Sequence, residues 1–162
     1  DRELSPVVLV YSDIADKNRT IFSPAFLRRE FFPRLARLVG AWHQHGIKVI
    51  FHSDGNLRDV LPDLQAAGVD GINPLEPLSK MYAGDIGKIF PDRILMGGID
   101  ASQLLPFGTE SEIRSTVRRT IDEAGAQGRL WLGSSTEIHP AVKLENALAM
   151  LDEIEEHGYY DN

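Results

Sequence analysis

The sequence predicts an α/β fold in which short parallel strands alternate with helices. Five apolar segments, each too short for a helix, are separated by segments whose apolar residues recur at helical spacing. Strict alternation with short links is typical of parallel strands joined by right-handed crossovers. A third observation is that polar residues or glycine follow every apolar segment. The predicted strands cover residues 7–11, 47–52, 71–73, 93–96 and 129–132.

Capping signals support the predicted helices. Ser23-Pro24 is typical of a helix start, with a hydroxyl at the cap and proline in the first turn. Thr109 and Glu112 have the spacing of a capping box. Pro33 is expected to break or restart the first helix because proline lacks the backbone N–H. The helical patterns cover residues 24–42, 57–64, 82–89, 109–121 and 144–154.

Composition indicates one ordinary soluble domain, which we place over residues 1–162, and it excludes several functions. A net charge of −7 argues against nucleic acid and anionic membrane surfaces as partners. No apolar stretch approaches the roughly 18 residues that a membrane span needs. There is no cysteine, so disulfides and thiolate metal ligands are excluded. No leader peptide is visible, and we therefore expect a cytoplasmic protein.

Two architectures satisfy the alternating pattern: an open doubly wound sheet and a (β/α)8 barrel. No glycine-rich phosphate-binding motif follows the first predicted strand, which weakens a dinucleotide-binding sheet. Polar residues after every strand favour a barrel, because the carboxyl ends of barrel strands carry the chemistry. Five strands cannot close an eight-stranded barrel of about 250 residues. We therefore expect about five carboxyl-terminal βα units, with roughly three units missing from the front.

His52 and Asp54 are the leading catalytic candidates. They follow a short apolar run that reads as a buried strand, and at a spacing of two residues they point to the same side of an extended backbone. An imidazole and a carboxylate suit zinc or another divalent metal, provided that a third ligand is present. Glu137 and His139, which follow the fifth strand, are the candidate further ligands. The alternatives are metal-free acid–base catalysis by His52 with Asp54 tuning its pKa, and a structural hydrogen bond.

Further polar residues follow the other strands and are expected on the same rim. Asp100 is either a third catalytic group that meets the substrate or the cap of the turn over residues 101–105. The remaining candidates are expected to bind substrate, and they are Ser12, Asp13, Asn73, Glu76, Ser134 and Ser135.

Several short motifs occur in a fixed order along essentially the whole chain. Those that matter most are Ser23-Pro24, Phe32-Pro33, His52-Ser53-Asp54-Gly55-Asn56, Gly68-Val69-Asp70-Gly71, Asn73-Pro74-Leu75, Met96-Gly97-Gly98-Ile99-Asp100, Gly108-Thr109, Gly133-Ser134-Ser135, Glu145-Asn146 and Gly158-Tyr159. With this ordered set the chain resembles the uroporphyrinogen decarboxylase superfamily. That superfamily includes the decarboxylase of tetrapyrrole synthesis and zinc-dependent methyltransferases that work with corrinoid proteins or coenzyme M. The resemblance implies the carboxyl-terminal part of a TIM (β/α)8 barrel.

The resemblance favours the methyltransferase branch, although both catalytic signatures are altered. That branch holds zinc with a His-x-Cys pair at the position of His52 and Asp54, and with a further cysteine near Ser134 and Ser135. Here His52 is kept, but Asp54 replaces the thiolate. The decarboxylase branch has a Lys-Gly-Gly run at this strand and a histidine where this chain has Ser134. Ser12 does resemble a pocket serine of the decarboxylase.

Three functions follow as expectations from this resemblance. The first is a methyltransferase-like enzyme that moves a methyl group between a small substrate and a corrinoid or thiol acceptor. It would use zinc or another divalent metal, with a corrinoid protein as partner. The second is uroporphyrinogen decarboxylase, which acts without a cofactor. The third is an inactive barrel fragment or binding module, whose open sheet edges would pair with the amino-terminal barrel half or with a second copy.

Overall fold

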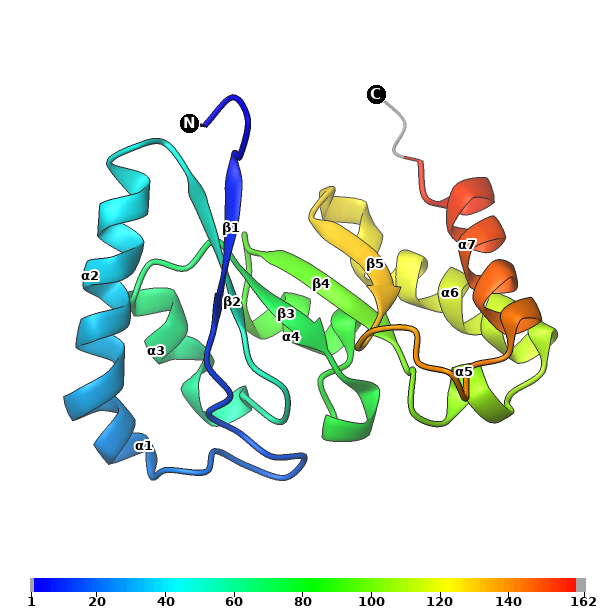
Figure 1. Ribbon diagram of the computed structural model, residues 1–162, viewed down its shortest axis with the longest axis horizontal. Helices are drawn as coiled ribbons and strands as arrows, with labels where there is room; N and C mark the ends of the chain where they lie inside the picture. Colours follow the sequence, from blue (N-terminus) through cyan, green and yellow to red (C-terminus); the bar gives the residue numbers. More distant parts are fainter. Residues whose placement is uncertain (1, 160–162) are drawn as a thin grey trace.

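Five parallel strands form one sheet in the computed structural model, which describes residues 2–159 apart from the side chain of Gln127. Neighbours in the sheet follow the order of the chain, and every neighbouring pair is parallel (Figure 1). The strands are β1 (Val7–Tyr11), β2 (Lys48–His52), β3 (Gly71–Leu75), β4 (Ile94–Ile99) and β5 (Leu130–Ser134). The strands expected from the sequence are thus confirmed, with ends that differ by at most three residues.

The strand order decides between the two architectures. A doubly wound sheet reverses its strand order at a switch point and carries helices on both faces. Here the order runs from β1 to β5 without a reversal. Successive right-handed crossovers in one direction place the connecting helices on one face of the sheet. This is the arrangement of a (β/α)8 barrel, and the expected partial barrel is confirmed.

The helices alternate with the strands as predicted. They are α1 (Pro24–Phe26), α2 (Phe32–His43), α3 (Leu61–Ala66), α4 (Ala83–Ile89), α5 (Leu104–Phe107), α6 (Glu110–Ala124) and α7 (Leu144–His157). A π-helical segment, Leu27–Phe31, separates α1 from α2 directly before Pro33. Proline lacks an N–H and crowds the carbonyl four residues earlier, so the helix restarts there as expected. Within residues 2–159, no helix combines the length and apolar character that crossing a bilayer requires.

Both predicted caps are formed. The Ser23 hydroxyl oxygen accepts a hydrogen bond from the Phe26 N–H at 3.2 Å. At the start of α6, the Thr109 N–H donates to the Glu112 carboxylate at 2.8 Å, and the Glu112 N–H donates to the Thr109 hydroxyl at 3.3 Å. Each cap satisfies backbone donors that the first helical turn leaves without a partner.

One face of the sheet packs against the helices. The register places five apolar residues in a row across the strands. All five belong to the main hydrophobic cluster or pack against it, and they are Val10, Phe51, Ile72, Leu95 and Leu130. Because side chains alternate along a strand, the residues beside this row point to the opposite face.

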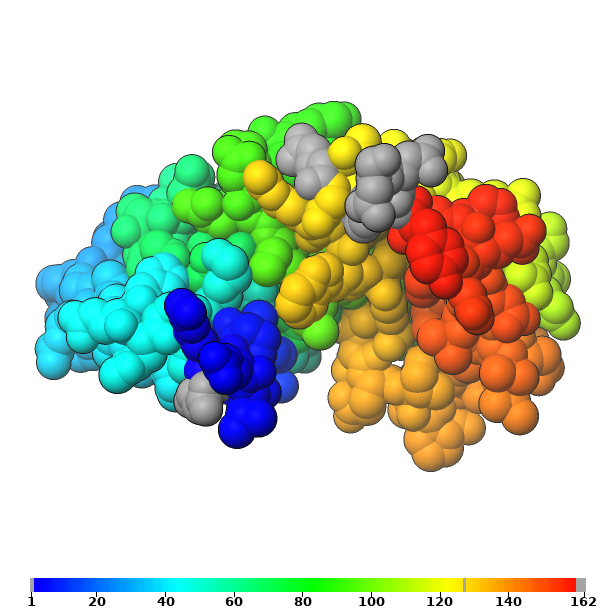
Figure 2. All heavy atoms as spheres, turned by 90° about the horizontal axis from the view of Figure 1, so that it is seen from above, coloured from blue at the N-terminus to red at the C-terminus, as the bar shows by residue number. Residues whose placement is uncertain are grey.

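The opposite face lines a hollow. Figure 2 shows the molecule as an arch, with a hollow between the amino-terminal segment (blue) and residues near 140 (orange). On this face Ile50, Gly71 and Ile94 lie side by side. A Cβ on Gly71 would lie 2.8 Å from the Ile50 Cδ1 and 2.7 Å from the Ile94 Cβ, so only glycine fits this close approach. β1 and β5 each have one neighbour, and the described sheet is therefore open at both edges.

A buried carboxylate joins the last two long helices. The Glu153 side chain on α7 is fully buried. It accepts hydrogen bonds from Arg114 at 3.2 Å and from Arg118, both on α6, and it lies 3.0 Å from the Nδ1 of His157. The guanidinium of Arg118 contributes most to holding the pKa of Glu153 below its ordinary value, against the opposing effect of burial.

We predict that Glu153→Gln lowers the free energy of unfolding at neutral pH by about 1–3 kcal/mol, because two arginines lose a charged acceptor. A lowered folded-state pKa means that the stabilisation is present above the ordinary carboxyl pKa of about 4.3 and is lost as the pH falls through the folded value. The difference between wild type and variant should therefore shrink in acid. Urea denaturation at neutral and acidic pH measures it. The matched control is Glu155→Gln, which changes an exposed carboxylate of the same helix. An equal loss in both variants would contradict the prediction.

Candidate functional site

Three side chains form a row at the carboxyl ends of the first three strands. The register pairs Tyr11 with His52 and His52 with Asn73. The rings of Tyr11 and His52 are 4.5 Å apart between centroids. On its other side, the Nδ1 of His52 lies 2.6 Å from the Oδ1 of Asn73. His52 is thus held between a neighbour from β1 and a neighbour from β3.

Two carboxylates meet the remaining ring nitrogen of His52. Its Nε2 lies 3.9 Å from the Oδ1 of Asp13 and 3.9 Å from the Oδ1 of Asp54. The two loops that carry these carboxylates are joined, because the Asp54 N–H donates to the Asp13 carboxylate at 3.0 Å. One ligand atom from each of the three residues lies within 4.8 Å of the others. We call Asp13, His52 and Asp54 the histidine–carboxylate cluster.

Buried hydrogen bonds hold these loops in place. The Ser53 hydroxyl, fully buried, accepts from the Ile14 N–H at 3.1 Å and donates to the Asp54 carbonyl at 2.8 Å. Gly55 adopts a φ of +92°, and a Cβ there would lie 2.5 Å from the Asp16 carbonyl oxygen. Only glycine can occupy this position without displacing the neighbouring loop. The backbone therefore fixes where Asp54 stands.

Glu76, which follows β3, supports the same turn. Its carboxylate accepts the Gly55 N–H at 2.7 Å and the Ser79 hydroxyl at 3.0 Å. It was expected from the sequence to contact substrate. Its observed partners are the backbone and a buried hydroxyl, so in this structure it positions the loop that carries Asp54.

The electrostatic surroundings of Asp54 are unfavourable for its charge. Burial raises the pKa of Asp54 first, and the charges of Glu76 and Asp13 raise it further. His52 acts in the opposite direction, and Glu137 adds a smaller increase. The charge of Glu137, which follows β5, therefore also acts on Asp54. Carboxylates from four separate loops therefore act on one another at this end of the sheet.

Other residues expected at the site have different partners. Asp100 is 8% exposed, and its two carboxylate oxygens accept the N–H groups of residues 102, 103 and 104. Asp100 therefore caps the turn over residues 101–105. Both ring nitrogens of His139 are engaged, with the Ala101 carbonyl at 3.0 Å and the Ala141 N–H at 3.3 Å. Glu137 is exposed and accepts from the Thr136 hydroxyl.

The three serines also lie at the strand ends. The buried Ser135 hydroxyl accepts the Ala101 N–H at 3.2 Å, which places it in the structural support of the Asp100 turn. Ser12 donates its backbone N–H to the His52 carbonyl at 3.0 Å, and its side chain is partly exposed. Ser134 ends β5 beside Ile99 and is also partly exposed. Ser12 and Ser134 remain accessible on the rim, whereas Ser135 does not.

The sequence did contain a signal for the role of Asp13 that we did not use. Asp13 follows Tyr11 by two residues, and Asp54 follows His52 by two residues. Tyr11 and His52 are directly paired, so the same offset brings both carboxylates to the same place. Comparing the two strand ends position by position would have grouped Asp13 with His52 and Asp54.

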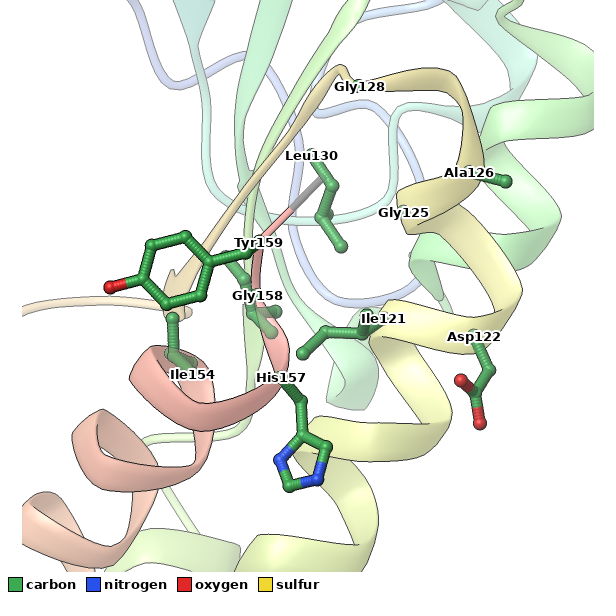
Figure 3. A pocket seen from close by; sticks show the side chains of 11 residues that line it. Ile121, Asp122, Gly125, Ala126, Gly128, Leu130, Ile154, His157, Gly158 and Tyr159 are labelled. Carbon is green, nitrogen blue, oxygen red and sulfur yellow. The ribbon is translucent and has the colours of Figure 1, made fainter. Parts of the chain in front are cut away.

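Two other features lie away from this site. A cavity of about 670 Å³ lies between α6, β5 and α7, and its lining includes Ile121 and Ile154 together with the polar Asp122 and His157 (Figure 3). Gly128, just before the start of β5, also lines it, and none of the histidine–carboxylate cluster does. A second group of possible ligands, Glu153 with Glu156 and His157, lies on α7, where the arginines already occupy Glu153.

Comparisons with known proteins agree with this fold. A solved structure of a methyltransferase from Methanosarcina mazei matches with a TM-score of 0.73 at 20% sequence identity. The match covers 94% of this chain and 42% of that chain, so this chain spans less than half the length of that neighbour. At this identity the likeness shows the fold alone. A comparison with curated proteins found no significant match.

The family comparison covers nearly the whole chain. The family model described as uroporphyrinogen decarboxylase matches residues 9–157. That range contains all five strands, apart from the first two residues of β1, and it includes the histidine–carboxylate cluster. The chain therefore belongs to the uroporphyrinogen decarboxylase family.

Proposed function

We propose that this chain carries the metal site of a methyltransferase-like enzyme of the family. In this proposal a divalent cation, zinc in the first instance, is held by Asp13, His52 and Asp54. The observation that carries the proposal is the convergence of an imidazole nitrogen and two carboxylate oxygens within 4.8 Å at the strand tips. This set differs from the one expected from the sequence, because His139 is occupied by backbone groups.

The residues present fit a divalent cation. Imidazole and carboxylate are ligands that zinc and other divalent metals accept, and catalytic zinc sites often use three protein ligands with one open position. The 3.9 Å distances from the His52 Nε2 are too long for hydrogen bonds, so these groups do not satisfy one another. A cation between them would offset the mutual repulsion that raises the pKa of Asp54.

The bound cation would act as a Lewis acid that polarises one reaction partner. The chain's own residues bind and orient. Asp13 and Asp54 supply negative charge, and the partly exposed Ser12 and Ser134 offer hydroxyl groups to a substrate on the same rim. The methyl group would pass between a small methylated substrate and a corrinoid or thiol acceptor. The structural neighbour from Methanosarcina mazei is a methyltransferase, which supports methyl transfer as the reaction class.

The acidic rim argues against the decarboxylase alternative for this chain. Uroporphyrinogen carries several carboxylates, which would meet the same repulsion that Asp54 experiences from Glu76, Asp13 and Glu137. A neutral or cationic substrate would not be repelled by these carboxylates.

The open edges of the described sheet indicate which partners this chain would have. Unpaired strand edges invite pairing with another strand. We propose that further βα units, in the same or another polypeptide, pair with the edges of β1 and β5 and enclose the substrate. An inactive fragment differs from the proposed enzyme on one testable point, since it requires no cation at the strand tips.

We predict that the chain, after treatment with a chelator and dialysis, takes up one equivalent of zinc per protomer. His52→Ala and Asp54→Ala should each weaken zinc binding by at least tenfold, since each removes one of three ligands. Isothermal titration calorimetry and elemental analysis measure the affinity and stoichiometry.

The matched control for the histidine is His43→Ala, because His43 pairs with Asp70 on the side of α2 and lies outside the cluster. Equal zinc affinity in wild type and His52→Ala would overturn the proposed metal site. A protein that transfers methyl groups fully without metal would overturn the proposed mechanism.

We predict a different result for Asp100. Asp100→Ala should lower the free energy of unfolding by about 1–2 kcal/mol, because three backbone N–H groups lose their cap. Zinc affinity should stay at the wild-type value. Denaturation with urea and zinc titration of the same sample check both parts. A loss of zinc affinity without a loss of stability would place Asp100 among the ligands instead.

A further inference from the structure

The contact between His52 and Asn73 determines where the imidazole carries its proton. The Nδ1 of His52 lies 2.6 Å from the Oδ1 of Asn73, a distance at which one partner must donate. The carbonyl oxygen of an amide has no hydrogen, so the donor is the Nδ1–H of His52. A neutral imidazole has one N–H, and its Nε2 then carries a free lone pair.

The opposite side of the ring offers no hydrogen bond that competes with this one. The Nε2 faces Asp13 and Asp54 at 3.9 Å each, beyond the range of a hydrogen bond. An N–H at Nε2 would therefore have no hydrogen-bond partner among these atoms, whereas an N–H at Nδ1 has a short one. The short contact with Asn73 is therefore the interaction that selects the tautomer.

The backbone holds both partners rigidly. His52 and Asn73 are directly paired between β2 and β3, and the Asn73 carbonyl accepts the Ser53 N–H at 2.9 Å. The Tyr11 ring packs against the imidazole at 4.5 Å and restricts rotation about the side-chain bonds. The short contact is thus built into the sheet, and it does not depend on a mobile loop.

We propose that Asn73 is a positioning residue that fixes the neutral His52 imidazole as the Nδ1–H tautomer and so directs the Nε2 lone pair at Asp13 and Asp54. The effect of Asn73 on cation binding rests on the proposed function, whereas the tautomer of His52 does not. An outer partner of this kind orients a metal-binding histidine and raises its basicity. The sequence placed Asn73 among substrate-binding residues, and this assignment gives it a different task.

The direct test is a long-range ¹H–¹⁵N correlation spectrum of metal-free protein labelled at histidine nitrogen, recorded at a pH where the imidazole is neutral. We expect the His52 signals of the Nδ1–H tautomer, assigned by their loss in His52→Gln. Signals of the Nε2–H tautomer would overturn the proposal, since they would mean that the Asn73 amide group donates. The wild-type spectrum alone gives this answer, even if a variant fails to fold.

Two substitutions test whether residue 73 accepts a hydrogen bond from the Nδ1 of His52 or donates one to it. Asn73→Asp retains an acceptor oxygen and should keep the Nδ1–H tautomer. Asn73→Ala removes it and should shift His52 toward the Nε2–H form, which free histidine prefers. Asn18→Ala, on an exposed loop, is the matched control and should leave the His52 signals unchanged. An unchanged tautomer in Asn73→Ala would overturn the proposal.

Zinc affinity provides a second readout. Loss of an outer-shell partner typically weakens metal binding by about 10–100-fold, and we expect that loss in Asn73→Ala but not in Asn18→Ala. If wild-type protein shows the Nδ1–H tautomer and binds no zinc, the positioning role of Asn73 is supported and the proposed metal site fails. If zinc binds and both tautomer and affinity survive Asn73→Ala, the metal site stands and the role of Asn73 fails.

Discussion

The site depends above all on the register between the first three strands. Tyr11, His52 and Asn73 form one row only because β1, β2 and β3 are paired at those positions. A slip of one residue would turn each side chain to the other face of the sheet. The neighbouring row, which includes Phe51 and Ile72, opposes such a slip because both side chains are fully buried against the helices. Burial of a large apolar side chain stabilises the fold by about 1.5–3 kcal/mol. The core therefore holds the register that places Tyr11, His52 and Asn73 in one row.

The sequence was sufficient for the fold because the signals for it are local. Alternating apolar runs, the Ser23 cap and the Thr109–Glu112 capping box all act within a few residues, and all appear in the structure. The pairing of His52 with Asp54 also follows from a local rule, the two-residue period of a strand. That Asp13 belongs to the histidine–carboxylate cluster was harder to predict, because this also depends on the register between β1 and β2.

The remaining site residues could not be assigned from the sequence because loop conformation decides their partners. The carboxylates of Asp100 and Glu76 turn toward backbone N–H groups, and the His139 ring is held by the Ala101 carbonyl. Nothing in the residue types distinguishes these groups from Asp13 and Asp54. The difference arises from turns such as the one at Gly55, whose φ of +92° and close contact with the Asp16 carbonyl set the path of the chain. Such contacts join segments about forty residues apart.

Cation binding and substrate enclosure place different demands on this sheet. All three residues of the histidine–carboxylate cluster come from β1, β2 and the loops that follow them, so the described residues contain all three ligands of the proposed metal site. β1 is also an edge strand, and its Tyr11 is 68% exposed beside His52. Exclusion of water strengthens the electrostatic effects on which catalysis depends, and here Asp13 of the cluster follows the edge strand β1 and is exposed. A strand added beside β1 would cover Tyr11 and close that edge. Under the proposed function, the cation binds to this chain alone, whereas efficient methyl transfer requires the further βα units proposed above.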